Sequence, residues 1–173
     1  MGDAMKRSDR RAQLSKGIID VLRGTIDHLA FFHSAIADRV GLNTTDYLCL
    51  QLLLRQGPQT AGELAEQVGI TSGAVTGLLD RLERTGYAVR TQDPEDRRRV
   101  IVSPVRGKVL AALEPLFESF FRELKRTLTR YNVSQLADLV EFLASVDELF
   151  EQETTEIRMG LNRPWRGPLP EAN

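Results

Sequence analysis

The sequence predicts a mainly α-helical protein in which a small lobe, ending in a β-hairpin, is inserted between long helices. Apolar residues recur every three or four positions through most of the 173 residues, the spacing of amphipathic helices. Two short β-favouring segments, residues 87–91 and 99–102, flank the turn sequence DPEDRR and indicate one hairpin. The longest apolar stripes lie before and after this region, so long helices are expected on both sides of it.

The composition is that of an ordinary globular chain, with 42% hydrophobic and 27% charged residues and a formal net charge of −1. Cys49 is the only cysteine, which excludes an intrachain disulfide. The N-terminal segment is charged and lacks the apolar stretch of a secretory signal, and no window approaches ~18 consecutive apolar residues. We therefore expect a cytoplasmic protein with no membrane partner.

Four helices are expected before the hairpin. Residues 18–40 carry a long apolar stripe, and this helix can extend back into the basic N-terminal segment. Residues 45–56 are apolar nearly all round, which is typical of a buried helix. Thr60 and Glu63 have the spacing of a capping box at the start of a short third helix. Thr71 can cap the fourth.

Two long helices are expected after the hairpin, which Pro104 ends. Residues 107–131 carry the first stripe, rich in leucine and phenylalanine. Ser134 can cap the last helix, and Gly160 ends it. Prolines then recur in the remaining residues, so an extended tail is expected there.

The third and fourth helices have the pattern of a helix-turn-helix. Ala65 is small where two short helices must cross closely, and Gly69 suits a tight turn with positive φ. Val75 and Leu78 are apolar on the side of the second helix that faces back. An ordinary helical hairpin is the alternative, but the joint match of these features favours DNA binding.

The second helix of the pair is then the recognition helix. Its apolar stripe leaves six residues pointing outward: Ser72, Gly73, Thr76, Gly77, Asp80 and Arg81. Glycine inside a helix costs about 1 kcal/mol relative to alanine, so two glycines on an exposed face favour a close approach of the backbone to a groove. Thr71 lies at the helix N-terminus, where a phosphate is favoured.

The hairpin after a recognition helix is a wing. Its tip has three consecutive arginines behind three acids, and residues 71–108 hold eight Lys/Arg against five Asp/Glu. An arginine at this tip can enter the narrow, electronegative minor groove. Asp96 is spaced to orient Arg98 across the tip. A solvated turn is the alternative interpretation of the same charges.

The segment TAGELAEQVGITSGAVTGLLDRLERTGY, followed by DPEDRRRVIV, resembles the MarR family of bacterial winged helix-turn-helix regulators. Asp96 to Arg98 matches the family's D-x-R wing motif, and the resemblance covers residues 18–155. Two positions depart from it: Gly77 stands where many members have arginine, and Ser103-Pro104 stands where many have Leu-Thr. The residues predicted to contact DNA are Thr60, Thr71, Ser72, Gly73, Thr76, Gly77, Arg81, Asp96, Arg97, Arg98 and Arg99.

The resemblance implies an effector-responsive homodimer, acting as a repressor on a palindromic operator in double-stranded DNA. It divides the chain into an N-terminal extension and dimerisation helix (1–43), a winged helix-turn-helix lobe (44–104), C-terminal dimerisation helices (105–159) and a tail (160–173). The outer helices independently favour a dimer, because Phe117, Phe120, Phe121, Phe142 and Phe150 exceed what one small lobe can cover. By analogy with family pockets, His33, Tyr47 and Arg55 are candidate effector contacts.

Other functions have less support in the sequence. His28, His33 and Cys49 have no clustered ligand spacing, so neither a metal nor another cofactor is expected. Cys49 lies in an apolar helix, which favours an inert thiol over a redox sensor. No phosphate loop or nucleophile motif predicts an enzyme. A winged helix that binds proteins without DNA is the remaining alternative, and the operator, the effector and the direction of regulation are left open.

Overall fold

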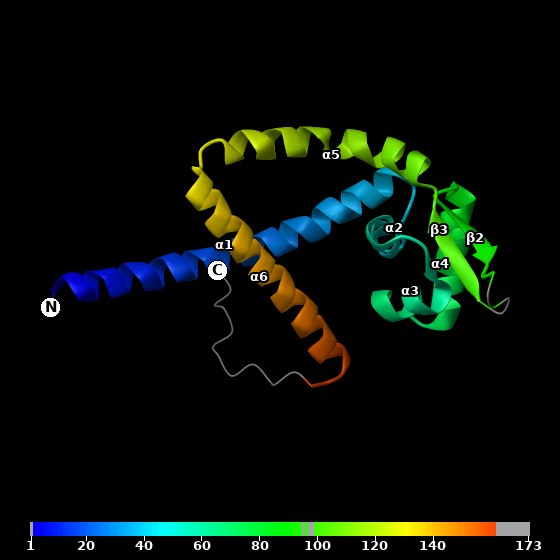
Figure 1. Cartoon of the computed structure of the whole chain (residues 1–173), viewed down its shortest axis with the longest axis horizontal. Coiled ribbons are helices and arrows are strands. Elements are labelled where there is room, and N and C mark those ends of the chain that lie inside the picture. The colour runs from blue at the N-terminus through cyan, green and yellow to red at the C-terminus, as the bar shows by residue number, and fades with distance from the viewer. Residues whose placement is uncertain (1, 95, 97–98, 162–173) are drawn as a thin grey trace. The chain divides into compact units, whose positions relative to one another are not determined.

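The computed structural model describes the backbone of residues 2–94, 96 and 99–161. The chain folds as two compact units, residues 1–119 and 120–173. The elements in chain order are α1 (Gly2–Arg39), α2 (Thr44–Gln56), β1 (Gln59–Thr60), α3 (Ala61–Val68), α4 (Ser72–Thr85), β2 (Ala88–Gln92), β3 (Val100–Pro104), α5 (Arg106–Leu128) and α6 (Val133–Arg158) (Figure 1). The predicted fold class is therefore confirmed.

The first unit contains a lobe built from α2 through β3, which we call the winged lobe. Its three strands form one antiparallel sheet in the order β1-β3-β2. Arg90 of β2 and Gln59 of β1 both pair with Val102 in the central strand. Strand β1 was not predicted, because it has only two residues, the second of which is the N-cap of α3, and this is too short for any alternation. Pro104 is paired with Ala88 at the end of β3, whereas the sequence placed it just after the strand.

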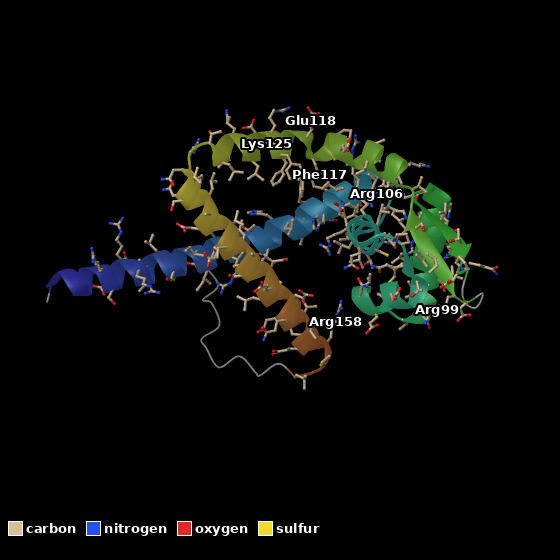
Figure 2. The ribbon with its side chains drawn as sticks, viewed as in Figure 1. Arg99, Arg106, Phe117, Glu118, Lys125 and Arg158 are labelled. Carbon is tan, nitrogen blue, oxygen red and sulfur yellow. The ribbon has the colours of Figure 1, made fainter. Side chains whose placement is uncertain are left out.

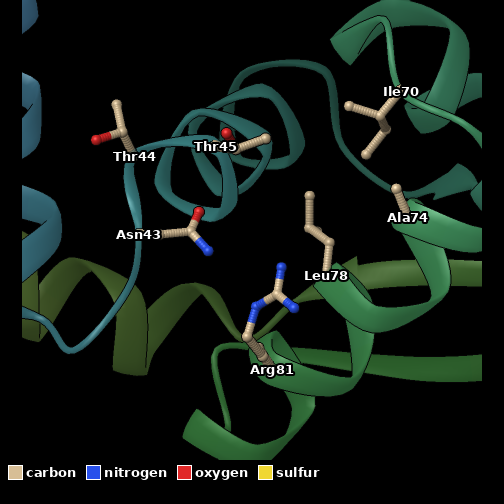
Figure 3. Close-up of a pocket in the computed structure, with 7 residues that line it drawn as sticks. All are labelled: Asn43, Thr44, Thr45, Ile70, Ala74, Leu78 and Arg81. Atoms are coloured by element: carbon tan, nitrogen blue, oxygen red, sulfur yellow. The ribbon is translucent and has the colours of Figure 1, made fainter.

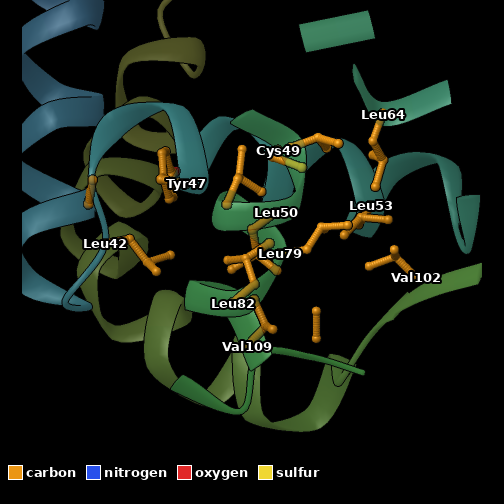
Figure 4. Packing of buried hydrophobic residues seen from close by; sticks show 14 of the residues in the cluster. Leu42, Tyr47, Cys49, Leu50, Leu53, Leu64, Leu79, Leu82, Val102 and Val109 are labelled. Atoms are coloured by element: carbon orange, nitrogen blue, oxygen red, sulfur yellow. The ribbon is translucent and has the colours of Figure 1, made fainter. Parts of the chain in front are cut away.

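The core of the first unit lies between α2, α4 and the sheet (Figure 4). Leu50 and Leu53 of α2, Leu79 and Leu82 of α4, and Val102 of β3 are all at most 2% exposed. Burying a leucine stabilises the fold by about 1.5–3 kcal/mol. Arg106 at the start of α5 donates from Nη1 to the carbonyl of Leu54 at 2.9 Å, which joins α5 to the end of α2 (Figure 2).

The second unit contains the end of α5 and all of α6. None of the α6 residues, all of which the structure describes, is buried. The large exposed apolar side chains of α6 are Val133, Val140, Phe142, Leu143, Leu149, Phe150 and Ile157. Phe120 and Phe121 of α5 are half exposed and contact each other edge to face. Phe117 differs from this group, because it belongs to the first unit and packs edge to face on Phe32 at 5.5 Å.

Within the described part of the chain, none of the helices combines the length and apolar character of a membrane span. Residues 162–173, which hold most of the predicted tail, lie outside the described residues.

The cap of α6 differs from the prediction. Asn132, not Ser134, is the N-cap, and its Oδ1 accepts a hydrogen bond from the backbone N–H of Gln135 at 3.0 Å. Gln135 Oε1 accepts in return from the backbone N–H of Asn132 at 2.9 Å, which completes a capping box. The sequence allowed either residue, since both are good caps.

Asn132→Ala should lower the free energy of unfolding by about 1 kcal/mol, because the backbone N–H of Gln135 at the start of α6 loses its hydrogen-bond acceptor. Ser134→Ala is the matched control and should leave it unchanged, since Ser134 lies inside the helix. Urea unfolding followed by circular dichroism measures both. An equal loss for the two variants would contradict the assignment of Asn132 as the cap.

Candidate nucleic-acid interface

Helices α3 and α4 form the predicted helix-turn-helix. Capping residues determine where α3 begins, where it ends and where α4 begins. Thr60 caps α3 through a reciprocal box: its Oγ1 accepts from the N–H of Glu63, and Glu63 Oε2 accepts from the N–H of Thr60 at 2.8 Å. The hydrogen bonds that the backbone N–H and Oγ1 of Thr60 donate to Glu63 Oε2 lower the pKa of the Glu63 carboxyl. Gly69 has φ 76°, as predicted for the turn, and Thr71 caps α4 by accepting from the N–H of Ala74.

The core side of α4 determines which residues it presents to solvent. Val75, Leu78, Leu79 and Leu82 are buried, so their spacing turns Ser72, Gly73 and Thr76 outward, and all three are exposed. Gly77 is half buried. Thr76 Oγ1 donates to the carbonyl of Ser72 at 3.1 Å, a bond that a competing acceptor can replace. The outer side of α4 thus combines small side chains with hydroxyl groups.

The wing consists of β2, β3 and the turn between them, and it lies beside α4. The N–H of Asp93 donates to the carbonyl of Arg99 at 3.0 Å, and the N–H of Arg99 donates to the carbonyl of Asp96 at 2.8 Å. Arg99 Nε lies 4.0 Å from Asp96 Oδ2, and both side chains are at least half exposed (Figure 2). Glu95, Arg97 and Arg98 lie outside the described residues, so the expected Asp96–Arg98 contact stays a prediction.

Arg81 does not lie free on the outer side of α4, although it is exposed, and its contact with DNA stays a prediction. Its Nε and Nη2 donate to the two carboxylate oxygens of Asp46, at 2.6 and 2.8 Å. The Asp46 side chain is 1% exposed, while that of Arg81 is 43% exposed. A buried carboxylate needs a partner, so the Arg81 guanidinium turns toward α2. These bonds raise the pKa of Arg81 further above its already high value.

Arg90 of β2 is a site residue that the sequence did not reveal. Its Nη1 lies 2.6 Å from Asp80 Oδ1 and 3.0 Å from Glu83 Oε2, and its Nη2 donates to the carbonyl of Thr76 at 2.9 Å. The guanidinium thus joins the wing to three residues of α4. The sequence does hold a signal for this contact, because Asp80 and Glu83 are three positions apart and so share one face of α4. Only the direction of the hairpin, however, shows that Arg90 meets these two acids.

Comparisons with known proteins agree with this geometry. A model of the MarR family matches residues 42–100. The uncharacterized HTH-type transcriptional regulator YcgE of Bacillus subtilis (strain 168) is 32% identical over 158 residues, which cover 89% of this chain and 99% of that protein. The chain belongs to the MarR family.

Solved structures share the fold. The transcriptional regulator Tm0710 from Thermotoga maritima has a TM-score of 0.59 at 24% identity, covering 81% of this chain and 98% of that one. Wild-type MarR in its apo form from E. coli has a TM-score of 0.54 at 21% identity, covering 73% and 93%. The resemblance drawn from residues 18–155 is therefore confirmed at the level of family and fold.

This MarR-family chain has a pocket of about 410 Å³ beside α4 (Figure 3). Its lining comes from the start of α2, the α3–α4 turn and the middle of α4, and consists of Asn43, Thr44, Thr45, Ile70, Ala74, Leu78 and Arg81. Figure 3 shows the guanidinium of Arg81 directed from α4 toward Asn43. The pocket therefore adjoins the Asp46–Arg81 contact.

The predicted effector contacts do not line this pocket. His33 of α1 and Tyr47 of α2 pack together with ring centroids 5.6 Å apart, and Arg55 lies exposed on α2. Burial lowers the pKa of His33. Burial raises the pKa of Tyr47, against the effect of the hydrogen bond that Gln51 donates to its Oη. A role in effector binding stays a prediction for all three.

Cys49 is fully buried in α2. Burial, with a smaller contribution from the negative charge of Asp46, raises the pKa of its thiol to about 12. Among the described residues, no group of three or more His, Cys, Asp or Glu side chains could hold a metal ion.

The native protein should therefore not react with a thiol reagent such as dithiobis-nitrobenzoate at neutral pH, because Cys49 is both protonated and inaccessible. Complete reaction is expected once the protein is unfolded in urea, which serves as the internal control. Absorbance of the released thiolate measures both states. Rapid stoichiometric reaction of the folded protein would contradict the inert-thiol interpretation.

Proposed function

We propose that this protein is a homodimeric transcriptional repressor of the cytoplasm, which binds a palindromic operator in double-stranded DNA and is released by a small-molecule effector. Its recognition element is the outer side of α4, with Ser72, Gly73, Thr76 and Gly77 in the major groove. Thr71 and Thr60 lie at helix N-termini, where backbone N–H groups favour phosphate. Arg97, Arg98 and Arg99 of the wing, oriented by Asp96, supply cations for the minor groove and adjacent phosphates.

The observation that best supports this proposal is that the fold itself does not require the two α4 glycines. A Cβ added at Gly73 would meet no described atom within 4 Å, and at Gly77 it would meet only Arg81 Nη1 at 3.5 Å. Neither glycine has a positive φ. Because glycine destabilises a helix, its presence on this side favours an external requirement, and a closely approaching groove floor supplies one.

The dimer is supported by apolar surface that the described chain leaves uncovered. α6 presents an apolar stripe with no buried residue, and Leu143 is 59% exposed at its centre. Exposed apolar patches of this extent are unusual on a monomer and typical of interfaces. Two-fold pairing covers them and places two α4 helices for two half-sites.

A route for the effector lies in the pocket beside α4. A molecule in the pocket of Figure 3 would touch Thr44 or Thr45 of α2 and Leu78 of α4, and so has a direct route to the recognition helix. Repression is proposed because a dimer that covers an operator excludes other proteins from the same DNA.

Gly77→Ala should raise the free energy of unfolding by about 0.5–1 kcal/mol while weakening operator binding by about 1–3 kcal/mol. The added methyl removes backbone freedom from the unfolded chain but occupies space that DNA needs. Gly17→Ala is the matched control: it lies in the exposed part of α1, where no described atom comes within 4 Å of a Cβ. It should stabilise the protein without changing DNA affinity.

Fluorescence anisotropy on a duplex that the wild type selects from a random-sequence pool, together with urea unfolding, measures both quantities. Unchanged DNA affinity for Gly77→Ala would remove the major support for close backbone approach. A wild-type protein that selects no duplex at all would favour the protein-interaction module instead.

Leu143→Glu should convert the dimer to a monomer or an aggregate, because it places a charge in the apolar stripe of α6. Ser145→Glu adds the same charge on the polar side of the same helix and should leave the dimer intact. Sedimentation equilibrium reads the mass of each variant. A wild-type monomer, or a Leu143→Glu variant that remains dimeric, would exclude this interface.

A further inference from the structure

The contact between Asp46 and Arg81 joins two helices from residues 35 positions apart in the sequence. Asp46 lies in the first turn of α2, and Arg81 lies in the third turn of α4. Both carboxylate oxygens accept a hydrogen bond from a different guanidinium nitrogen, at 2.6 and 2.8 Å. The pair is therefore a bidentate contact, in which the carboxylate and guanidinium planes must align.

The Asp46 carboxylate is held in place by Asn43, independently of Arg81. Asn43 Nδ2 donates to Asp46 Oδ2 at 3.0 Å, and Asn43 Oδ1 accepts from the N–H of Asp46 at 2.8 Å. Asn43 is itself the N-cap of α2. The carboxylate is thus fixed in the frame of α2, and Arg81 can satisfy it in one orientation.

The buried leucines of α4 cannot supply the same directional constraint. Leu78, Leu79 and Leu82 are at most 2% exposed and hold α4 against the core. Apolar packing, however, is non-directional, and it tolerates small rotations of a helix about its own axis. A bidentate ion pair does not, because two parallel hydrogen bonds are lost when the planes tilt.

We propose that Arg81 is a positioning residue for sequence recognition: its bidentate contact with Asp46 sets the rotation of α4 and thereby where Ser72, Thr76 and Gly77 meet the groove. The inference rests on the DNA-binding function proposed above. Contacts to phosphates tolerate a small rotation, whereas contacts to base edges do not. Loss of the bidentate geometry should therefore reduce discrimination between DNA sequences and spare the general affinity for DNA.

Arg81→Lys separates the effect of the bidentate geometry from the effect of the positive charge. Lysine keeps the cation that Asp46 needs but binds as a point charge without the planar fork. Arg106→Lys is the matched control, because Arg106 also donates to α2, at the carbonyl of Leu54, from α5 instead of α4. The probes are the duplex that the wild type selects from a random-sequence pool and a scrambled duplex of the same composition.

Arg81→Lys should lower the ratio of selected to scrambled affinity by about tenfold, the loss expected when one base contact is misplaced, with scrambled affinity unchanged. Arg106→Lys should keep the wild-type ratio. A purely structural role for Arg81 would reduce the folded fraction and change both affinities by the same factor. An unchanged ratio for folded Arg81→Lys overturns the proposal.

Asp46→Asn is the second variant, in case Arg81→Lys does not fold. The introduced amide has one oxygen, so it can accept only one of the two hydrogen bonds from the Arg81 guanidinium. The ratio of selected to scrambled affinity should therefore fall again, and a retained ratio overturns the proposal. Amide NMR shifts of Ser72 to Thr76, recorded without DNA, should change in both variants and not in Arg106→Lys. This readout also separates the two ideas: shifted amides in a protein that selects no duplex would support the positioning contact and contradict DNA binding.

Discussion

Burial of one side of α4 determines what the rest of the winged lobe can present. Val75, Leu78, Leu79 and Leu82 recur at helical spacing, and all four are at most 3% exposed. Each such side chain stabilises the fold by about 1.5–3 kcal/mol, more than any single exposed ion pair contributes. Because this side of α4 is fixed in the core, Gly73 and Thr76 face outward. The chemistry of the candidate interface therefore follows from a pattern of buried apolar residues.

Polar contacts then add directional constraints to the position of α4 that apolar burial sets. Arg81 joins α4 to α2 through Asp46, and Arg90 joins α4 to the wing through Asp80 and Glu83. The two arginines act from different elements on the same helix. Residues that the sequence alone would assign to an outer charged surface therefore hold the recognition helix, and the outer side keeps small and hydroxyl-bearing residues.

Much of the fold could be predicted because its elements carry local signals. The capping box at Thr60, the glycine turn at Gly69 and the stripe of α4 depend only on near neighbours in the chain. Strand β1 could not be predicted, because it exists only through its pairing with β3. The contact of Arg81 with Asp46 could not be predicted for a related reason: a helical pattern gives direction around the helix axis, but it does not reveal a buried carboxylate 35 positions earlier.

The most direct test of this account is a selection of duplexes from a random-sequence pool by the wild-type protein, followed by affinity measurements at two salt concentrations. We expect the pool to become enriched in a palindrome whose half-sites lie about one helical turn, ~10 bp, apart. We also expect an affinity that falls steeply as salt rises, because the wing arginines and helix N-termini displace counterions from phosphates. A pool that remains unenriched, or binding that is equal at both salt concentrations, would contradict the proposed DNA recognition.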